Sequence, residues 1–243
     1  VRAAAGNLKK VTLELGGKSP MIVMADADLE AAVGGCLRSA YFLSGQNCQC
    51  GSRIFVHRSL HDRLLEGLVA GARRLKVGPG HEPDTLVGPL ISARQRERVE
   101  ELVASGRGQG GTVAAGGSRV GDEGWFYAPT VFADVRPEMR IVREEVFGPV
   151  TCVQRFDDHD LDAVARQAND TAYGLVGSVW TRDLEVAHRL AHRLRAGLVG
   201  INMHGMADVT MPFGGYKASG WGREFGPEGL DPYLETKTVT LAL

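Results

Sequence analysis

The stretch TCVQRFDDHDLDAVARQANDTAYGLVGSVWTRDLEVAHRLAHRLRAGLVGIN, residues 151–202, decides the fold class of this chain. Its short apolar and β-branched runs predict three strands, at 151–156, 177–181 and 198–202. The segments between them, at 160–169 and 183–195, repeat apolar residues at helical spacing. Strands that alternate with such helices are typical of parallel crossover units. The sequence therefore predicts an α/β fold in which helices cover both faces of a parallel sheet.

The same alternation extends toward the N-terminus. We expect strands at 11–15, 21–24, 53–57, 112–115 and 127–135, and helices at 28–41, 60–75 and 92–105. Asp28 is the expected cap of the first of these helices. The opening VRAAAGNLKK (1–10) resembles the end of a helix. The β-branched segment ETKTVTLAL (235–243) predicts a strand, which must pair with a distant segment or with another subunit because no partner lies near it in sequence.

Composition excludes several classes of partner. The 243 residues, 44% hydrophobic and 23% charged, suffice for one large domain or two small ones. A net charge of −1 offers no basic field to nucleic acid or anionic lipid. No apolar run reaches the roughly 18 residues of a membrane span. The four cysteines show no disulfide-framework spacing. We therefore expect a cytoplasmic protein with no nucleic-acid or membrane partner.

Several short motifs look like ligand sites but lack the required context. GRGQGG (106–111) matches a dinucleotide fingerprint, but that motif follows a strand and opens a helix, and the predicted order here is reversed. GGKS (16–19) lacks the first glycine of a phosphate loop. His188 and His192 lie one helical turn apart, but Arg189 and other basic residues surround them. We interpret these segments as a surface loop, a turn and a solvated helix face, and we expect no metal.

One candidate site has a context that supports chemistry, and it is built on a cysteine nucleophile. SGQNCQCGSRIFVH (44–57) places Cys48 and Cys50 between a helix and a strand. A thiol attacks a carbonyl only as the thiolate, and hydrolysis of the product needs a general base. Glu14 is a candidate base because it interrupts the apolar run VTLELGG and precedes two glycines, which allow a ligand to approach the backbone. From these residues alone, Glu14 could equally be an edge-strand glutamate that faces water.

Five segments, in this order and spacing, resemble the aldehyde dehydrogenase superfamily. They are LELGGKSP (13–20), GQNCQCGSR (45–53), EEVFGPV (144–150), AND with YGL (168–175) and PFGGYKASGWGRE (212–224). Each segment alone would be weak evidence for this family, but the five in series are specific to it. The resemblance spans essentially the whole chain. The resemblance implies that Cys48 is the nucleophile, that Cys50 is a packed small side chain and that Glu14 is the general base. It also implies that Glu224 belongs to a proton path to Glu14.

The resemblance implies an NAD or NADP cofactor and an aldehyde substrate. Glu145, rather than Glu144, would bind the ribose hydroxyls next to the nicotinamide. Phe147 would lie beside the nicotinamide ring, and the Leu15 carbonyl would accept a hydrogen bond from the carboxamide. The expected wall of the aldehyde tunnel comprises Phe42, Asn47, Gln49, Gly205 and Phe213. Asn202 is expected to hold loop structure. The implied reaction adds the Cys48 thiolate to the aldehyde, transfers a hydride to NAD(P)⁺ and releases a carboxylic acid with water activated by Glu14.

The resemblance also implies a domain organisation. Residues 1–16 would end a dinucleotide-binding domain, 17–216 would form the catalytic domain, and 217–243 would be a return segment with a C-terminal oligomerisation strand. Because the family places its cofactor-binding half before the catalytic domain, we expect that half upstream of Val1. The chain alone is then expected not to oxidise aldehydes, and the full-length protein to be a homodimer or homotetramer.

Two alternatives remain from the sequence. One is a cofactor-free thiol hydrolase of activated esters, which needs Cys48 and Glu14. The other is a catalytically silent association domain, favoured if Cys48 is no more reactive than Cys36. The substrate is open as well, since NMHGMADVTMPFGG (202–215) resembles the branch that takes aromatic and betaine-like aldehydes. The small Gly205 and Ala207 would leave room for a bulky group near Phe213.

Overall fold

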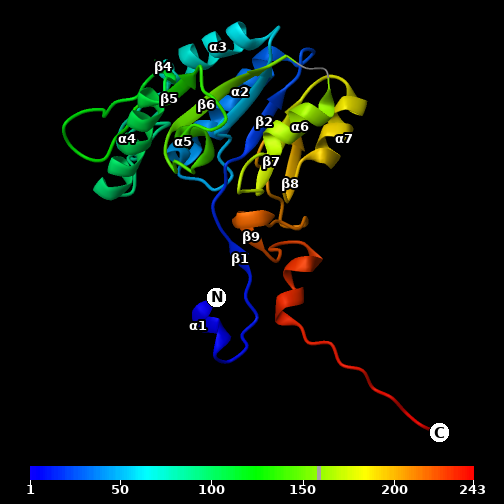
Figure 1. Ribbon diagram of the computed structural model, residues 1–243. Coiled ribbons are helices and arrows are strands. Elements are labelled where there is room, and N and C mark those ends of the chain that lie inside the picture. The colour runs from blue at the N-terminus through cyan, green and yellow to red at the C-terminus, as the bar shows by residue number, and fades with distance from the viewer. Residues whose placement is uncertain (158–159) are drawn as a thin grey trace.

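A seven-stranded sheet forms the centre of the molecule in the computed structural model, which describes residues 1–157 and 160–243 (Figure 1). Its strands are β2 (Pro20–Val23), β3 (Arg53–His57), β4 (Thr112–Ala115), β5 (Thr130–Ala133), β6 (Val150–Phe156), β7 (Val176–Trp180) and β8 (Leu198–Ile201). They are ordered β4-β5-β6-β3-β2-β7-β8, and all neighbours are parallel except β4 and β5. The predicted α/β class with a parallel sheet is confirmed.

Helices cover both faces of this sheet, as predicted. Helices α2 (Leu29–Tyr41) and α3 (His61–Arg74) pack on the face that presents Met21, Val23 and Ile54. The opposite face is covered by α4 (Ala93–Gly108), α5 (Arg140–Arg143), α6 (Leu161–Asn169) and α7 (Leu184–Arg193). Because side chains alternate along a strand, both faces of the central strands are apolar and become buried.

Side-chain caps begin several helices where the sequence changes from extended to periodic, although α3 has none. Asp28 accepts a hydrogen bond from the Ala31 N–H at 3.1 Å and so caps α2, as predicted. Ser92 caps α4 and Asp183 caps α7 in the same way. Each cap satisfies one of the backbone donors that the first helical turn leaves unpaired.

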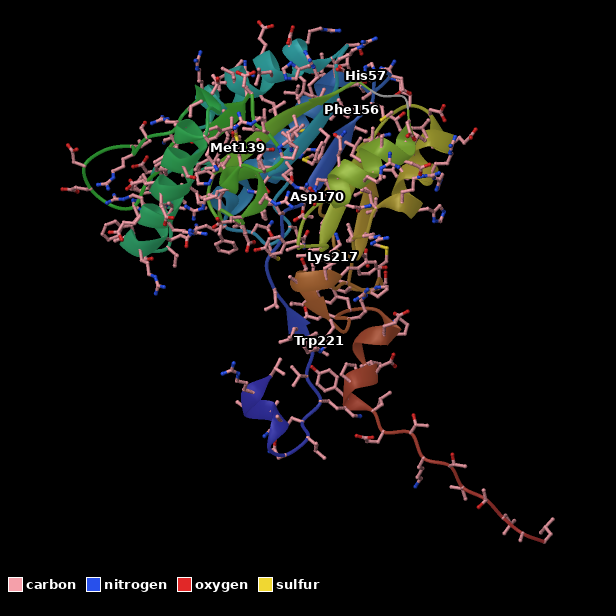
Figure 2. The ribbon with its side chains drawn as sticks, viewed as in Figure 1. His57, Met139, Phe156, Asp170, Lys217 and Trp221 are labelled. Atoms are coloured by element: carbon pink, nitrogen blue, oxygen red, sulfur yellow. The ribbon has the colours of Figure 1, made fainter. Side chains whose placement is uncertain are left out.

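A second, two-stranded sheet lies outside the main one. β1 (Leu13–Glu14) pairs antiparallel with β9 (Gly220–Trp221), so that Glu14 lies opposite Gly220. Figure 2 marks Lys217 and Trp221 on this segment below the large sheet, and α1 (Arg2–Ala5) lies further out in Figure 1. Four short 3₁₀ turns complete the described elements: η1 (Phe42–Gly45), η2 (Lys217–Ser219), η3 (Pro227–Gly229) and η4 (Asp231–Tyr233). The β1–β9 pair brings together residues about 200 positions apart in sequence.

The ends of the chain depart from the predicted elements. The expected strand at 11–15 shrinks to β1, and the strand at 127–135 shrinks to β5. The segment 235–243 extends away from the rest of the chain and pairs with no other described strand (Figure 1), so its predicted pairing with another subunit stays a prediction. The division of the chain into three parts, at 1–16, 17–216 and 217–243, stays a prediction.

The excluded motifs lie in contexts that do not suit ligand sites. Residues 106–108 end α4, with Gly106 buried, so the predicted surface loop is shorter than expected, and 109–111 lead to β4, the reverse of a dinucleotide-binding order. His188 and His192 are exposed on α7. Within the described ranges, no group of three His, Cys, Asp or Glu side chains could hold a metal ion. No helix in the same ranges is long and apolar enough to cross a bilayer.

Leu64→Ala should destabilise the chain by about 2–5 kcal/mol, because Leu64 is 0% exposed between α3 and the sheet and its truncation leaves a cavity. The free energy of unfolding in urea measures this loss. Leu184→Ala is the matched control, since Leu184 is 70% exposed and its truncation should change stability by less than about 0.5 kcal/mol. Equal losses in the two variants would contradict the assigned core.

Candidate active site

A tight turn presents Cys48 between α2 and β3. After α2 the backbone enters the left-handed region at Leu43, Ser44 and Gly45, with φ values of 51°, 60° and 68°. The chain then turns back, and the Cys50 N–H donates to the Asn47 carbonyl at 3.0 Å. The Asn47 side chain accepts from the Gln49 N–H at 3.0 Å. We define residues 47–50 as the nucleophile turn.

The glycine pair Gly16–Gly17 lies directly against this turn. A Cβ atom on Gly17 would lie 2.1 Å from the Cys48 carbonyl oxygen, and one on Gly16 would lie 2.0 Å from a carboxylate oxygen of Glu145. The Gly17 N–H donates to the other carboxylate oxygen of Glu145 at 3.0 Å. The two glycines therefore hold Cys48 and Glu145 against one stretch of backbone, and no larger residue fits there.

Cys48 differs from the other three cysteines in its exposure. Cys36, Cys50 and Cys152 are buried, and burial raises the pKa of these thiols to about 12, about 12 and about 11. Cys48 is only partly buried. Burial, and then the charges of Glu145 and Glu14, also raise its pKa, while the backbone N–H groups of Cys48 and Gln49 oppose that rise. Cys50 is thus a packed side chain, as predicted, and Cys48 is the accessible thiol.

Glu14 faces inward from β1. Both of its carboxylate oxygens are buried, and neither has a hydrogen-bond partner among the described residues. Burial and the negative charge of Glu224 raise its pKa, and the nearby Gly215 backbone and Arg223 act in the opposite direction. The alternative of a water-facing edge glutamate is therefore wrong. A buried, unpartnered carboxylate with a raised pKa suits a general base.

The other residues predicted around Glu14 lie close to it. Glu224 is exposed, and its backbone pairs with that of Phe213 through two hydrogen bonds of 2.7 Å. Its charge acts on Glu14, which puts it within electrostatic range of the candidate base. The Leu15 N–H donates to the Ser219 carbonyl at 3.0 Å, so the end of η2 also fixes the start of the glycine pair.

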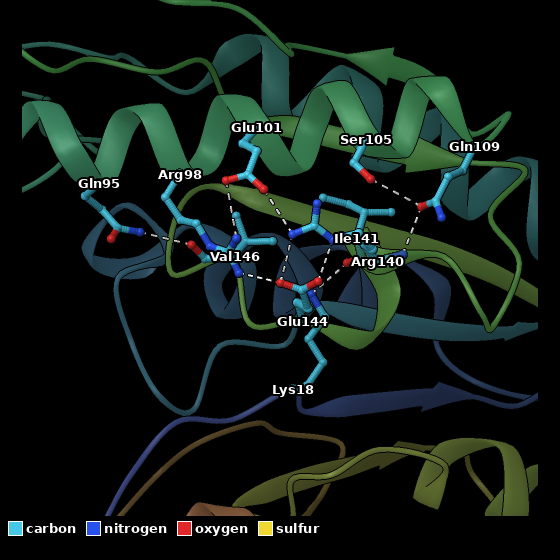
Figure 3. Close-up of polar contacts among 10 residues, drawn as sticks. All are labelled: Lys18, Gln95, Arg98, Glu101, Ser105, Gln109, Arg140, Ile141, Glu144 and Val146. Carbon is cyan, nitrogen blue, oxygen red and sulfur yellow. Dashed lines mark hydrogen bonds and ion pairs between the residues drawn. The ribbon is translucent and has the colours of Figure 1, made fainter.

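The segment 144–150 presents Glu145 inward and Glu144 outward. Burial raises the pKa of Glu145, whereas Arg140 and Arg98 hold the pKa of Glu144 below its usual range (Figure 3). Phe147 is 38% exposed, with φ at 52° in the left-handed region. A non-glycine residue held there is strained and needs its neighbours to fix it.

Gln95 of α4 helps to fix the backbone at Phe147, a role that the sequence analysis did not predict. Its side-chain amide donates to the carbonyls of Val146 and Phe147 at 3.0 and 2.8 Å, and the first of these bonds is drawn in Figure 3. Lys18 was missed as well: it is buried, and its ammonium donates to the Ile141 carbonyl at 2.8 Å. Gln95 lies outside the five segments and Lys18 lies inside one of them, but each acts through a contact between distant segments, which the sequence does not show.

A cavity of about 580 Å³ lies beside the nucleophile turn. Four of the five predicted tunnel residues line it: Phe42, Asn47, Gln49 and Gly205. Phe213 does not line this cavity; its side chain is 6% exposed and packs with Leu175, Val176 and Cys48. Asn202 exchanges two hydrogen bonds with the Thr181 backbone, at 3.0 and 2.9 Å, which confirms its predicted role in loop structure.

The site therefore combines an accessible thiol, a buried carboxylate that can act as a base, and a second carboxylate held by two glycines. These are the groups that covalent catalysis by a thiol requires. The model of the aldehyde dehydrogenase family matches residues 1–239, and the chain belongs to this family.

Relatives agree with this assignment. The betaine aldehyde dehydrogenase of Bacillus subtilis (strain 168) is 48% identical over 98% of this chain and 49% of its own length. A mitochondrial aldehyde dehydrogenase of Leishmania tarentolae is 47% identical over 99% of this chain and 48% of its own. A solved NAD⁺ complex of an aldehyde dehydrogenase from Bacillus cereus superposes with a TM-score of 0.95 at 47% identity, covering 98% of this chain and 48% of that one. The chain thus spans about half the length of these relatives.

Glu14→Gln should raise the thermal unfolding midpoint more at pH 7 than at pH 4. The folded-state pKa of Glu14 lies above the unfolded value of about 4.3, so ionising this carboxyl opposes folding. Its contribution to stability is complete below the unfolded pKa and is lost as pH rises through the folded value. Glutamine stays neutral throughout. Thermal unfolding at both pH values tests this, with the exposed Glu66→Gln as control; a midpoint gain that does not depend on pH would contradict the assignment.

Gly17→Ala should displace the nucleophile turn, because the added methyl group would overlap the Cys48 carbonyl. We expect the free energy of unfolding to fall by about 1–3 kcal/mol and the alkylation of Cys48 to slow. Urea unfolding and mass spectrometry of the alkylated peptide measure the two effects. Gly80→Ala is the matched control, since a Cβ there meets nothing within 4 Å. A Gly17→Ala chain with unchanged stability and reactivity would refute the contact.

Proposed function

We propose that this chain carries the catalytic residues of an NAD- or NADP-dependent aldehyde dehydrogenase, which oxidises an aldehyde to a carboxylic acid through a thioester on Cys48. One observation carries the proposal: the Gly16–Gly17 backbone packs against the main-chain carbonyl of Cys48, the residue with the accessible thiol, and against the Glu145 carboxylate. A hydrolase of activated esters would need the thiol and Glu14, but it would have no use for Glu145 at this place.

The reaction begins when the Cys48 thiolate adds to the aldehyde carbon and forms a thiohemiacetal oxyanion. The Cys48 backbone N–H, which lowers the pKa of the neighbouring thiol, is the donor that we assign to this oxyanion. Loss of a hydride from the same carbon leaves a thioester. Glu14 then takes a proton from water, the resulting hydroxide attacks the thioester, and the carboxylic acid and the Cys48 thiolate separate.

The residues present fit the nicotinamide end of such a cofactor. Glu145 is cradled by Gly16, accepts from the Gly17 N–H and retains a second carboxylate oxygen for a ribose hydroxyl. The Phe147 side chain is exposed beside it, and the Leu15 carbonyl lies at the start of the glycine pair. When bound, NAD(P)⁺ would accept the hydride, and its positive ring would oppose the two carboxylates that raise the pKa of Cys48.

The cavity beside the turn supports a bulky, uncharged aldehyde. Among its described lining residues, Arg38 is the one charged side chain, and none is acidic. Phe42, Met203 and Met206 give it an apolar wall. A volume of about 580 Å³ accommodates an aromatic ring. We therefore propose an aromatic aldehyde, while betaine aldehyde, which the names of several relatives specify, is the competing substrate.

We also propose a cytoplasmic homodimer or homotetramer for the complete protein. The apolar residues Val239 and Leu241 are 82% and 83% exposed in the extended segment 235–243, which favours pairing with a second subunit. All four cysteines are free thiols, in keeping with a reducing compartment.

Iodoacetamide alkylation, resolved by cysteine with mass spectrometry, tests the nucleophile in this chain. Cys48 should react at least about tenfold faster than Cys36 at pH 7, because Cys36 is buried and its thiol pKa is raised to about 12. A chromogenic ester should give a burst that disappears in Cys48→Ala. Equal rates at Cys48 and Cys36 would favour a silent association domain.

The protein encoded by the complete reading frame tests the oxidation itself. It should form NADH or NADPH from phenylacetaldehyde, and Cys48→Ala and Glu14→Gln should each abolish steady turnover. The same assay with betaine aldehyde decides between the two substrates. Ester hydrolysis with no cofactor reduction in the complete protein would overturn the dehydrogenase proposal in favour of the thiol hydrolase.

A further inference from the structure

His204 connects the nucleophile turn to the core of the sheet. Its Nε2 lies 2.8 Å from the Gln49 carbonyl oxygen, one residue after Cys48. Its Nδ1 lies 2.9 Å from the Ser178 hydroxyl, which is 0% exposed on β7. Ser178 in turn accepts from the Trp180 indole N–H at 3.2 Å. Both ring nitrogens of His204 are therefore engaged, one by the turn and one by a central strand.

The partners define which nitrogen carries the proton. A carbonyl oxygen only accepts, so Nε2 must be the donor to Gln49. In the neutral ring Nδ1 is then an acceptor, and the Ser178 hydroxyl donates to it while accepting from Trp180. Burial lowers the pKa of His204 to about 4, so the ring is neutral at pH 7 and this arrangement holds. The donors run in one direction from Trp180 to the turn.

We propose that His204 is a positioning residue that holds the Gln49 carbonyl and thereby fixes the nucleophile turn in the conformation that presents the Cys48 thiol. The inference rests on the proposed function, because it assumes that Cys48 is the nucleophile. It goes beyond that function in assigning a role to a residue that touches neither the reacting atoms nor the proposed cofactor residues.

Within the turn the Cys50 N–H donates to the Asn47 carbonyl, and the side-chain contacts other than that of His204 lie one peptide unit earlier. Gly17 packs against the Cys48 carbonyl, and Asn47 accepts from the Gln49 N–H. Both contacts bear on the Cys48–Gln49 peptide unit. His204 alone among the described side chains bonds the next peptide unit, at the Gln49 carbonyl. Without it, that partly buried carbonyl would lose its partner, and the turn could rotate toward a new one.

The test is the pH dependence of the Cys48 alkylation rate by iodoacetamide, from which the thiol pKa follows. His204→Leu removes the donor and should lower the rate at pH 7 by about tenfold and shift the thiol pKa, because the turn that presents Cys48 is no longer held at the Gln49 carbonyl. His204→Gln should restore the rate to within about threefold, since its amide can donate to the same carbonyl. Ser178→Ala should give a smaller loss than His204→Leu, because the ring keeps its bond to Gln49.

Three controls make the outcome decisive. His188→Leu changes an exposed histidine on α7 and should leave the Cys48 rate unchanged. Unfolding midpoints identify variants that fail to fold, and if His204→Leu is one of them, Ser178→Ala and His204→Gln carry the test. The inference is overturned if folded His204→Leu keeps the wild-type rate and thiol pKa, or if Gln and Leu lower the rate equally. If wild-type Cys48 reacts no faster than Cys36, the proposed function fails instead.

Discussion

The contact on which the rest of the site depends is the one between the Gly16–Gly17 backbone and two polar groups, the Cys48 carbonyl and the Glu145 carboxylate. Neither glycine leaves room for a Cβ atom, so the nucleophile turn and the carboxylate-bearing segment 144–150 share one surface of main chain. The separation of these groups is therefore fixed by backbone packing, which is stiffer than a side-chain contact. Displacing the glycine pair would move both groups together.

The sheet positions that contact. β2 follows the glycine pair directly, and it pairs with β3, which follows the nucleophile turn. β6 begins directly after the segment that bears Glu145 and pairs with the other edge of β3. Parallel strands that start together bring the loops before them to one edge of the sheet. The thiol and Glu145 therefore meet there, while β1 reaches the same place by pairing with β9 and brings Glu14.

The electrostatics of this edge are unfavourable for the chain by itself. Burial raises the pKa of Cys48, Glu14 and Glu145 at once, and the two carboxylates raise that of the thiol further. Phe147 adds a strained backbone conformation at the same place. Several buried ionisable groups and a strained backbone in one place are typical of functional sites, where a bound ligand balances the charge. Away from this edge the chain follows its local sequence preferences, as in the side-chain caps of α2, α4 and α7 and the apolar strands.

The sequence by itself determined the fold class, most strands and helices, the identity of Cys48 as the distinctive cysteine and the family, because periodicity and short motifs are local properties. It left open which way Glu14 faces, and it gave no role to Gln95, Lys18 or His204. Only the tertiary structure decided these points, because burial, strand pairing and a hydrogen bond between residues as distant as Gln49 and His204 depend on where the fold brings them.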